Sequence, residues 1–318
     1  MSSHSTDNGR VFDAPSGNWV YRVLPRAAWP YAQLARWDRP IGWQLLMWPC
    51  FWSAALAANA AAGIGHAVIG QFAWHLFLFF IGAVAMRGAG CTYNDLVDQD
   101  IDMQVARTRS RPLPSGRASS LGAKIFLVVQ ALVGLGVLLC FNGFTIVLGI
   151  LSLALVAIYP FAKRFTNWPQ FFLGMAFSWG ALMGWAAVFS SISVASVTLY
   201  LAAICWTIGY DTIYAHQDKE DDAIVGVRST ARLFGDSTKI WLLAFFAATV
   251  LLAAISFVAA GIGFFGWLGL VIAAFMFGYQ LIVLDIRDAA QCLELFKFNH
   301  VVGAVIFAGL AIGIPFAG

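Results

Sequence analysis

Two short stretches of the sequence gather carboxylates, and the spacing in the first would bring them together on a helix. In NDLVDQDID, Asn94, Asp98 and Asp102 follow one another at intervals of four residues, and Asp95 precedes Asp98 by three. A helix would place these four side chains on one face, because residues three and four apart are neighbours there. Asp100 would point elsewhere. The stretch therefore predicts a cluster of oxygen donors.

The second stretch, YDTIYAHQDKEDD, repeats the arrangement further along the chain. Asp218 and Asp222 are four residues apart, and Asp221 lies three after Asp218. Asp211 precedes Asp218 by seven residues, so a helix would carry it on the same side, deeper in an apolar segment. A basic segment containing glycine follows each stretch, which makes the two stretches alike in both signs of charge.

Carboxylates crowded in this way need a positive partner. Like charges four residues apart on a helix repel each other, and a carboxylate at the centre of a bilayer costs about 2.5–3.5 kcal/mol on insertion scales. Magnesium fits, because it is a hard cation usually held by one or two carboxylates together with substrate phosphates. No zinc site is indicated, since His216 stands alone and the five cysteines show no paired spacing.

Basic side chains close to these stretches could bind the anion that such a metal carries. Arginine in particular matches phosphate oxygens with two parallel hydrogen bonds. The candidates for binding a diphosphate are Arg107, Arg109, Arg111, Lys163 and Arg164. A basic loop of this kind also serves as a topology determinant or an anionic-lipid contact, and the two roles are compatible.

The surrounding sequence indicates what the diphosphate carries. A diphosphate held by Mg²⁺ is a good leaving group, and the apolar, aromatic-rich chain around it suits a polyprenyl tail. Ionisation would leave an allylic cation, which the faces of aromatic side chains stabilise. Asp211 could stabilise that cation or help to position an acceptor. We therefore expect a polyprenyl diphosphate as one substrate.

The elements that position these residues are membrane helices. Of the 318 residues, 60% are hydrophobic and 11% are charged, with a mean hydropathy of +0.77, whereas soluble domains carry about 25% charged residues. Runs of roughly 20 apolar residues can span a bilayer as helices. Nine such runs predict an all-α membrane protein with helices around a central cavity: about 41–63, 71–93, 121–141, 144–161, 169–189, 194–214, 239–261, 263–284 and 299–317.

The basic residues predict the orientation. The connections at 62–70, 142–143, 190–193 and around 262 contain no Lys or Arg. All 19 basic residues fall in the N-terminal segment or near the alternate connections, which by the positive-inside rule face the cytoplasm. We therefore expect a cytoplasmic N-terminus and an active site on the same side.

The N-terminal segment has no apolar core of a signal peptide, and residues 1–25 are expected to be disordered. The next piece, RAAWPYAQLARWDRP, has the composition of a short helix lying in the headgroup layer. A single domain is expected to occupy residues 26–318. We predict the bacterial inner membrane as its location, with the mitochondrial inner membrane as the alternative.

Several motifs together resemble the UbiA family of intramembrane prenyltransferases. They are RWDRPIGWQLLMWPCFWSAALA at 36–57, NDxxDxxxD at 94–102, RTRSRPLPSG at 107–116 and YDTIYAHQDKEDD with GVRSTARLFG between 210 and 235. The resemblance implies nine spans, with Mg²⁺–diphosphate bound by Asn94, Asp98, Asp218 and Asp222. Asp95 and Asp102 occupy further metal-motif positions, and Asp211 matches the tyrosine–aspartate pair of the family.

The flanking residues most resemble the branch of the family that prenylates 4-hydroxybenzoate in ubiquinone biosynthesis, at the ring carbon ortho to the hydroxyl. Arg39, just before the first span, and Arg87, near the end of the second, are the two candidates for binding the aromatic carboxylate. An enzyme of the same type with another acceptor (homogentisate, heme or naphthoate) is the nearest alternative. A cation-coupled transporter is the alternative of a different class, because intramembrane carboxylates also mark transporters.

Overall fold

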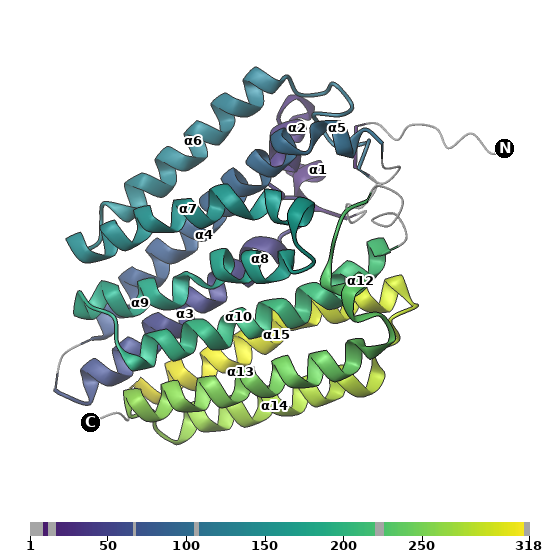
Figure 1. Ribbon diagram of the computed structural model, residues 1–318. Coiled ribbons are helices and arrows are strands. Elements are labelled where there is room, and N and C mark those ends of the chain that lie inside the picture. Colours follow the sequence, from purple (N-terminus) through teal and green to yellow (C-terminus); the bar gives the residue numbers. More distant parts are fainter. Residues whose placement is uncertain (1–8, 12–16, 66–67, 105–107, 220–225, 315–318) are drawn as a thin grey trace. The chain divides into compact units, whose positions relative to one another are not determined.

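The computed structural model describes residues 9–11, 17–65, 68–104, 108–219 and 226–314, and throughout these ranges the regular structure is helical (Figure 1). Nine helical stretches in these ranges are long and apolar enough to cross a membrane. This confirms the predicted all-α membrane architecture. The stretches are α3 (Ile41–Ala62), α4 (Ile69–Val97), α6 (Ser120–Leu138), α7 (Gly143–Phe165), α8 with α9 (Pro169–Phe189), α10 (Val194–Ala215), α12 with α13 (Thr230–Ala260), α14 (Phe264–Val283) and α15 (Ala289–Gly313).

Short elements connect the long helices. Near the N-terminus lie α1 (Trp19–Val23), η1 (Arg26–Ala28) and α2 (Trp29–Leu34), and α5 (Gln99–Asp102) follows α4. The fifth span is broken at Trp179 into α8 (Pro169–Ser178) and α9 (Gly180–Phe189). Three more elements surround the second acidic stretch: η2 (His216–Asp218), α12 (Thr230–Phe234) and η3 (Gly235–Ser237), which precedes α13 (Thr238–Ala260).

The last helix begins ten residues earlier than the apolar run predicts, at Ala289 rather than about 299. Asp288 caps it, because its side chain accepts from the backbone N–H groups of Ala290 and Gln291. Lys297 donates to Glu294 at 2.9 Å, an exposed pair three residues apart that suits a helix. Hydropathy alone misses this first part of α15 because it is polar, although it is helical.

The chain divides into two compact units, and α3 and α4 each contribute to both. The first unit comprises 1–43 and 82–136. Its N-terminal elements pack through Val20, Trp29 and Ala32, and a second cluster joins Leu34 to residues of the connection before α6 and of α6 itself. The expectation of disorder over 1–25 is wrong for Trp19–Val23, which form α1.

Helix α2 also differs from its predicted role. A helix in the headgroup layer would keep one apolar face against lipid. In the structure Ala32, Gln33 and Leu34 are all buried within the first unit. Trp29 of this segment is therefore part of the interior, whereas Arg26 is exposed, and α2 lies against the connection that follows the first acidic stretch.

The second unit comprises 44–81 and 137–318. In it α10 packs against α8, α9, α13 and α15, and α14 packs against α13 and α15 (Figure 1). Small residues permit close helix contact, as is common in membranes. A Cβ on Gly309 of α15 would lie 2.6 Å from the backbone oxygen of Phe265 in α14. This glycine is therefore required by the approach of the two helices.

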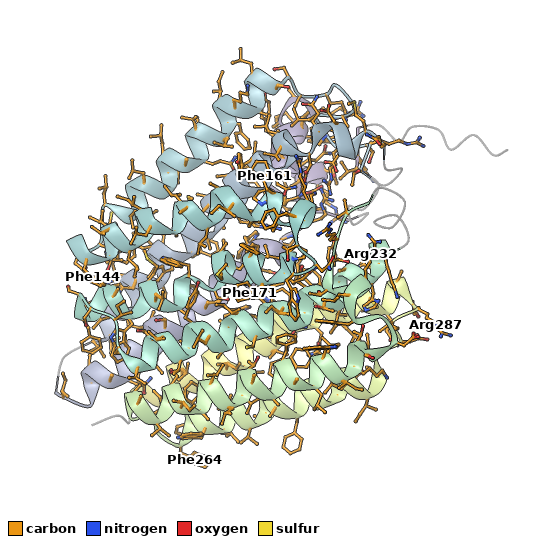
Figure 2. The ribbon with its side chains drawn as sticks, viewed as in Figure 1. Phe144, Phe161, Phe171, Arg232, Phe264 and Arg287 are labelled. Carbon is orange, nitrogen blue, oxygen red and sulfur yellow. The ribbon has the colours of Figure 1, made fainter. Side chains whose placement is uncertain are left out.

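The outer surface of the second unit is apolar. Phe144, Phe161, Phe171 and Phe264 are exposed and project from the helices, as Figure 2 shows. The labelled basic side chains Arg232 and Arg287 lie at the other end of the unit from Phe264 (Figure 2). Exposed aromatic and aliphatic residues on spans of this length are those of a protein embedded in lipid.

Candidate active site

The first acidic stretch lies where α4 ends and α5 begins. Asp98 interrupts the helix, yet the backbone pattern continues across it: Asp98 N–H donates to the Asn94 carbonyl at 2.9 Å, and Asp102 N–H donates to the Asp98 carbonyl at 2.8 Å. The side-chain amide of Asn94 donates to Asp98 Oδ2 at 3.0 Å. The four-residue spacing thus produces the stack that the sequence predicts, and α4 runs four residues beyond its predicted end to carry Asn94 and Asp95.

The carboxylates of this stretch differ in how deeply they are buried. Asp95 is fully buried, and Asp98 and Asp102 are only 1% and 6% exposed. Asp100 is exposed, as expected for a residue that lies off the helix face shared by Asn94, Asp98 and Asp102. Burial disfavours charged carboxylates, so each buried member requires a partner.

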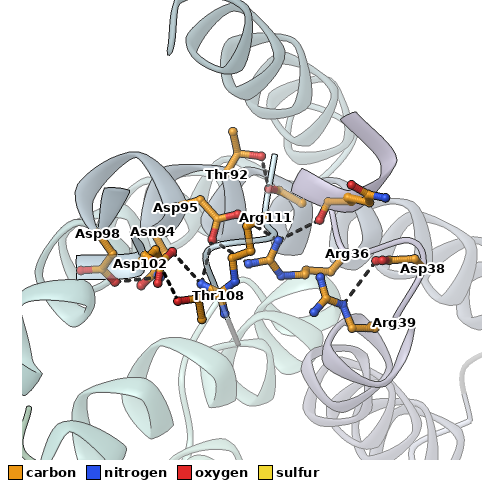
Figure 3. A network of polar contacts seen from close by, with 12 residues as sticks. Arg36, Asp38, Arg39, Thr92, Asn94, Asp95, Asp98, Asp102, Thr108 and Arg111 are labelled. Atoms are coloured by element: carbon orange, nitrogen blue, oxygen red, sulfur yellow. Dashed lines mark hydrogen bonds and ion pairs between the residues drawn. The ribbon is translucent and has the colours of Figure 1, made fainter. Parts of the chain in front are cut away.

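Two arginines supply part of that compensation (Figure 3). Arg36 binds Asp95 with both ends of its guanidinium, Nη1 to Oδ2 at 2.9 Å and Nη2 to Oδ1 at 2.6 Å. Arg111 donates to Asp102 Oδ2 at 2.8 Å and approaches Asp95 Oδ1 at 3.5 Å. Burial raises the pKa of the Asp102 carboxyl, an effect that Arg111 partly offsets.

Hydrogen bonds and apolar contacts hold the connection between α5 and α6 in place. Thr108 donates from its hydroxyl to the Asp102 carbonyl at 2.9 Å, and Leu113 and Ala118 pack in the cluster with Leu34. Arg117 donates to Gln33 Oε1 at 2.8 Å. Of the predicted diphosphate-binding arginines, Arg109 is exposed, Arg111 belongs to the ion-pair network, and Arg107 lies outside the described residues.

The candidates for binding an aromatic carboxylate lie in the first unit. Arg39 Nε donates to Asp38 Oδ1 at 3.4 Å, and Tyr21 donates from its hydroxyl to Asp38 Oδ2 at 3.1 Å. Asp38 is fully buried, so it needs these partners. Arg87 lies beside Gly42 at the start of α3: a Cβ on Gly42 would be 2.6 Å from Arg87 Nε.

The second acidic stretch belongs to the second unit. Asp211 lies in the last part of α10 and is half-buried. The next residue, Thr212, shares a 2.6 Å hydroxyl contact with Thr230, which ties α12 to α10. Asp218 ends the 3-10 turn η2, so the chain tightens here instead of continuing α10. Asp221 and Asp222 lie outside the described residues.

The second group of basic candidates is at the end of α7. The Lys163 carbonyl accepts from the Arg228 backbone N–H at 3.1 Å, and the Phe165 carbonyl accepts from the Arg228 guanidinium at 2.9 Å. Lys163 is half-buried, whereas Arg164 is exposed and lies over the Phe161 ring at 5.4 Å. These contacts connect the segment after the second acidic stretch to the predicted diphosphate-binding residues of α7.

The donor chemistry suits magnesium. The side chains available in the stack are one amide and two carboxylates, which are the oxygen ligands that a hard divalent cation takes. Among the described residues, no three His, Cys, Asp or Glu side chains form a group that could hold a metal by themselves. The first stretch therefore fits a Mg²⁺ ion that takes its remaining ligands from elsewhere, as the substrate-dependent sites of this metal do.

Several residues of this network were not predicted from the sequence to belong to the site. Arg36, Asp38 and Gln33 read as parts of an interfacial helix, and Tyr21 lies in the segment expected to be disordered. Three charges in the short stretch ARWDRP, placed directly before an apolar span, were the available signal. Charged side chains at such a position need buried partners if the segment folds into the protein.

Comparison with known proteins agrees with these features. Residues 46–303 match the sequence model of the UbiA prenyltransferase family. The chain is 48% identical over 300 residues to the mitochondrial 4-hydroxybenzoate polyprenyltransferase of Arabidopsis thaliana, covering 94% of this chain and 72% of that protein.

Solved structures show the same fold. The apo structure of a UbiA homologue from Aeropyrum pernix is 25% identical, with a TM-score of 0.67 over 83% of this chain and 97% of that one. A UbiA homologue from Archaeoglobus fulgidus, bound to GPP and Mg²⁺, is 16% identical, with a TM-score of 0.58 over 90% of this chain and 99% of that one.

Proposed function

The chain belongs to the UbiA prenyltransferase family, and from that premise we propose how its residues transfer a polyprenyl group to 4-hydroxybenzoate in ubiquinone biosynthesis. The assignment of 4-hydroxybenzoate as the acceptor rests on the 48% identity to a 4-hydroxybenzoate polyprenyltransferase over 94% of the chain. The stack of Asn94, Asp98 and Asp102, in which both carboxylates are buried, supports the diphosphate half of the reaction.

The reaction exchanges a C–O bond for a C–C bond. The bond between the allylic carbon and the diphosphate oxygen breaks, and its electron pair leaves with the diphosphate. The ring carbon ortho to the hydroxyl of 4-hydroxybenzoate attacks the allylic carbon, because the phenolic oxygen donates electron density to that position. The ring then loses the proton from the same carbon, which restores aromaticity.

The proposed metal ligands come from both acidic stretches. Asn94, Asp98 and Asp102 supply oxygen atoms from the first, and Asp218 and Asp222 supply them from the second. Bound Mg²⁺ would neutralise the negative charge that develops on the leaving diphosphate. The magnesium-bound state of the Archaeoglobus homologue supports this choice of cofactor.

The basic residues bind the diphosphate oxygens in this proposal. Arg107, Arg109, Lys163 and Arg164 are assigned to that role, and Arg111 holds Asp102 while contributing positive charge nearby. Fixed positive groups act mainly by stabilising the charge that develops in the transition state. Asp211, half-buried in α10, is placed to stabilise the allylic cation or to position the acceptor.

Arg39 is the proposed partner of the aromatic carboxylate. It lies at the start of the first span, and Asp38 holds its Nε, so that the guanidinium has a defined orientation. Arg87 remains the alternative. A guanidinium binds a carboxylate with two parallel hydrogen bonds, which selects acceptors that carry an acid group at this position.

Purified protein tests the acceptor directly. With Mg²⁺ and geranyl diphosphate, we expect the mass of geranylated 4-hydroxybenzoate and no product with homogentisate or heme. Turnover of one of those acceptors in place of 4-hydroxybenzoate would refute the assignment.

The protein is an integral membrane protein. We place its active residues on the cytoplasmic or matrix side, from the distribution of Lys and Arg. The name of the Arabidopsis relative fits the mitochondrial alternative and not the bacterial inner membrane. Fractionation of the source cells, with immunodetection of the chain, distinguishes the two locations.

A further inference from the structure

Asp95 stands in the first acidic stretch beside residues assigned to the metal, yet its surroundings differ from theirs. We propose that Asp95 is the buried counter-ion of Arg36 and that this pair is a positioning element, which sets Asn94 and Asp98 without itself binding metal. The role of those two neighbours rests on the proposed function. The ion pair itself is independent of the proposed function, because it forms between two side chains of the protein without metal or substrate.

The geometry of the pair is that of a buried, two-pronged ion pair. Both carboxylate oxygens of Asp95 accept from Arg36, at 2.9 and 2.6 Å, and Asp95 Oδ1 also lies 3.5 Å from Arg111 Nη1. The Asp95 side chain has no exposed surface, and that of Arg36 is 12% exposed. Two-pronged pairs of this type are the strongest and most specific that arginine forms with a carboxylate.

The backbone of Arg36 is shaped to make this contact. Its φ of 58° is left-handed, a conformation that is unfavourable for a residue other than glycine. The guanidinium donates through Nη1 to the Gln33 carbonyl at 2.8 Å as well as to Asp95. The turn after α2 thus directs the side chain back toward α4, where Asp95 accepts from it.

Electrostatics indicates why Asp95 is a poor metal ligand. Burial by itself lowers the pKa of Arg36, but Asp95, with smaller contributions from Cys91 and Asp38, raises the pKa of Arg36 well above its ordinary value. A metal at Asp95 would have to displace a charged guanidinium from a site without solvent. Removing one partner of a buried pair leaves an uncompensated charge, which is strongly destabilising.

The position of the pair explains its effect on the site. Asp95 follows Asn94 directly and precedes Asp98 by three residues on the last turn of α4. A rigid link from Asp95 to the turn after α2 fixes the rotation of that helical turn. Asn94 and Asp98 are thereby held with the amide of one against the carboxylate of the other, at 3.0 Å.

A double-mutant cycle tests the pair. The variants are Arg36→Gln, Asp95→Asn and the two together, with Arg36→Gln/Asp98→Asn as the matched control. Thermal unfolding is measured in detergent without metal or substrate, and binding of Mn²⁺ with inorganic pyrophosphate is followed by electron paramagnetic resonance. We expect each single variant to lower the melting temperature and the Arg36→Gln/Asp95→Asn variant to recover at least half of the larger loss.

The Mn²⁺ measurement separates a positioning residue from a ligand. We expect Arg36→Gln alone to weaken Mn²⁺ binding about tenfold, because the link that sets Asn94 and Asp98 is lost. The Arg36→Gln/Asp95→Asn variant, whose two amides can hydrogen-bond at the same position, should bind Mn²⁺ within about threefold of the wild type, and the control with Asp98→Asn should bind at least tenfold more weakly. If a single variant does not fold and the Arg36→Gln/Asp95→Asn variant does, the regained folding itself demonstrates the recovery. Additive losses, an unfolded double variant, or Mn²⁺ binding as weak as in the control would overturn the proposal.

The two proposals fail separately. The unfolding cycle needs neither substrate nor metal, so it reports on the ion pair even if the wild type proves inactive on 4-hydroxybenzoate. An inactive wild type with a coupled pair would refute the proposed function only. An active wild type with uncoupled variants would refute the positioning role only.

Discussion

Replacement of Asp98 by Asn is the sharpest test of the metal site. The substitution keeps the size and shape of a side chain that is 1% exposed and removes only its negative charge. The Asn94 amide lies 3.0 Å from Asp98 Oδ2 and could still donate to the oxygen of the new amide. The change in packing is therefore small, and a loss of activity reports on charge.

The expected loss follows from the electrostatic role of the side chain. Two unit charges about 4 Å apart interact by about 4 kcal/mol at an effective dielectric constant near 20. Removal of one group that stabilises transition-state charge costs about 2.7–4 kcal/mol in enzymes of known mechanism, a factor of roughly 10²–10³ in kcat. We expect Asp98→Asn to lose activity by such a factor.

The assay is the rate of 4-hydroxybenzoate prenylation at increasing Mg²⁺, with the unfolding temperature measured beside it. The matched control is Asp100→Asn, which removes the same charge from an exposed position of the same motif. We expect the control to stay within twofold of the wild type. If Asp98→Asn also stays within twofold, or if the control loses as much, the assignment of Asp98 to the metal fails.

Three further predictions concern the acceptor, the packing and the metal. Arg39→Met should raise the KM for 4-hydroxybenzoate by roughly 10–100-fold, as loss of a charged hydrogen bond implies. The KM for prenyl diphosphate should change less than about threefold. If only Arg87→Met gives this result, the role of binding the aromatic carboxylate belongs to Arg87. Gly184→Ala should lower the unfolding free energy by about 1–3 kcal/mol, because its Cβ would lie 2.5 Å from the Ala54 nitrogen, whereas Gly278→Ala, with no atom within 4 Å, should not lower it. Chelation with EDTA should abolish turnover and added Mg²⁺ should restore it, and turnover that persists in excess EDTA would contradict a metal-dependent reaction.

Much of the molecule follows from local sequence. The number and the approximate places of the membrane helices depend on runs of apolar residues, and hydropathy records these directly. The stack of Asn94, Asp98 and Asp102 depends on a four-residue interval, which any helix turns into a common face. Where local polarity and structure disagree, as in the first part of α15, the prediction fails at the boundary of an element and not in its type.

Only the tertiary structure distinguished the roles of the clustered carboxylates. Sequence spacing treats Asp95 and Asp98 alike, but Asp95 is bound by Arg36, which lies 59 residues away along the chain. Likewise, nothing local connects Asp38 with Tyr21, 17 residues earlier, or Arg117 with Gln33, 84 residues earlier. A short interval in the sequence determines which face of a helix a side chain takes. The burial of that face, and the charge that meets it, depend on segments distant in the chain that folding brings together.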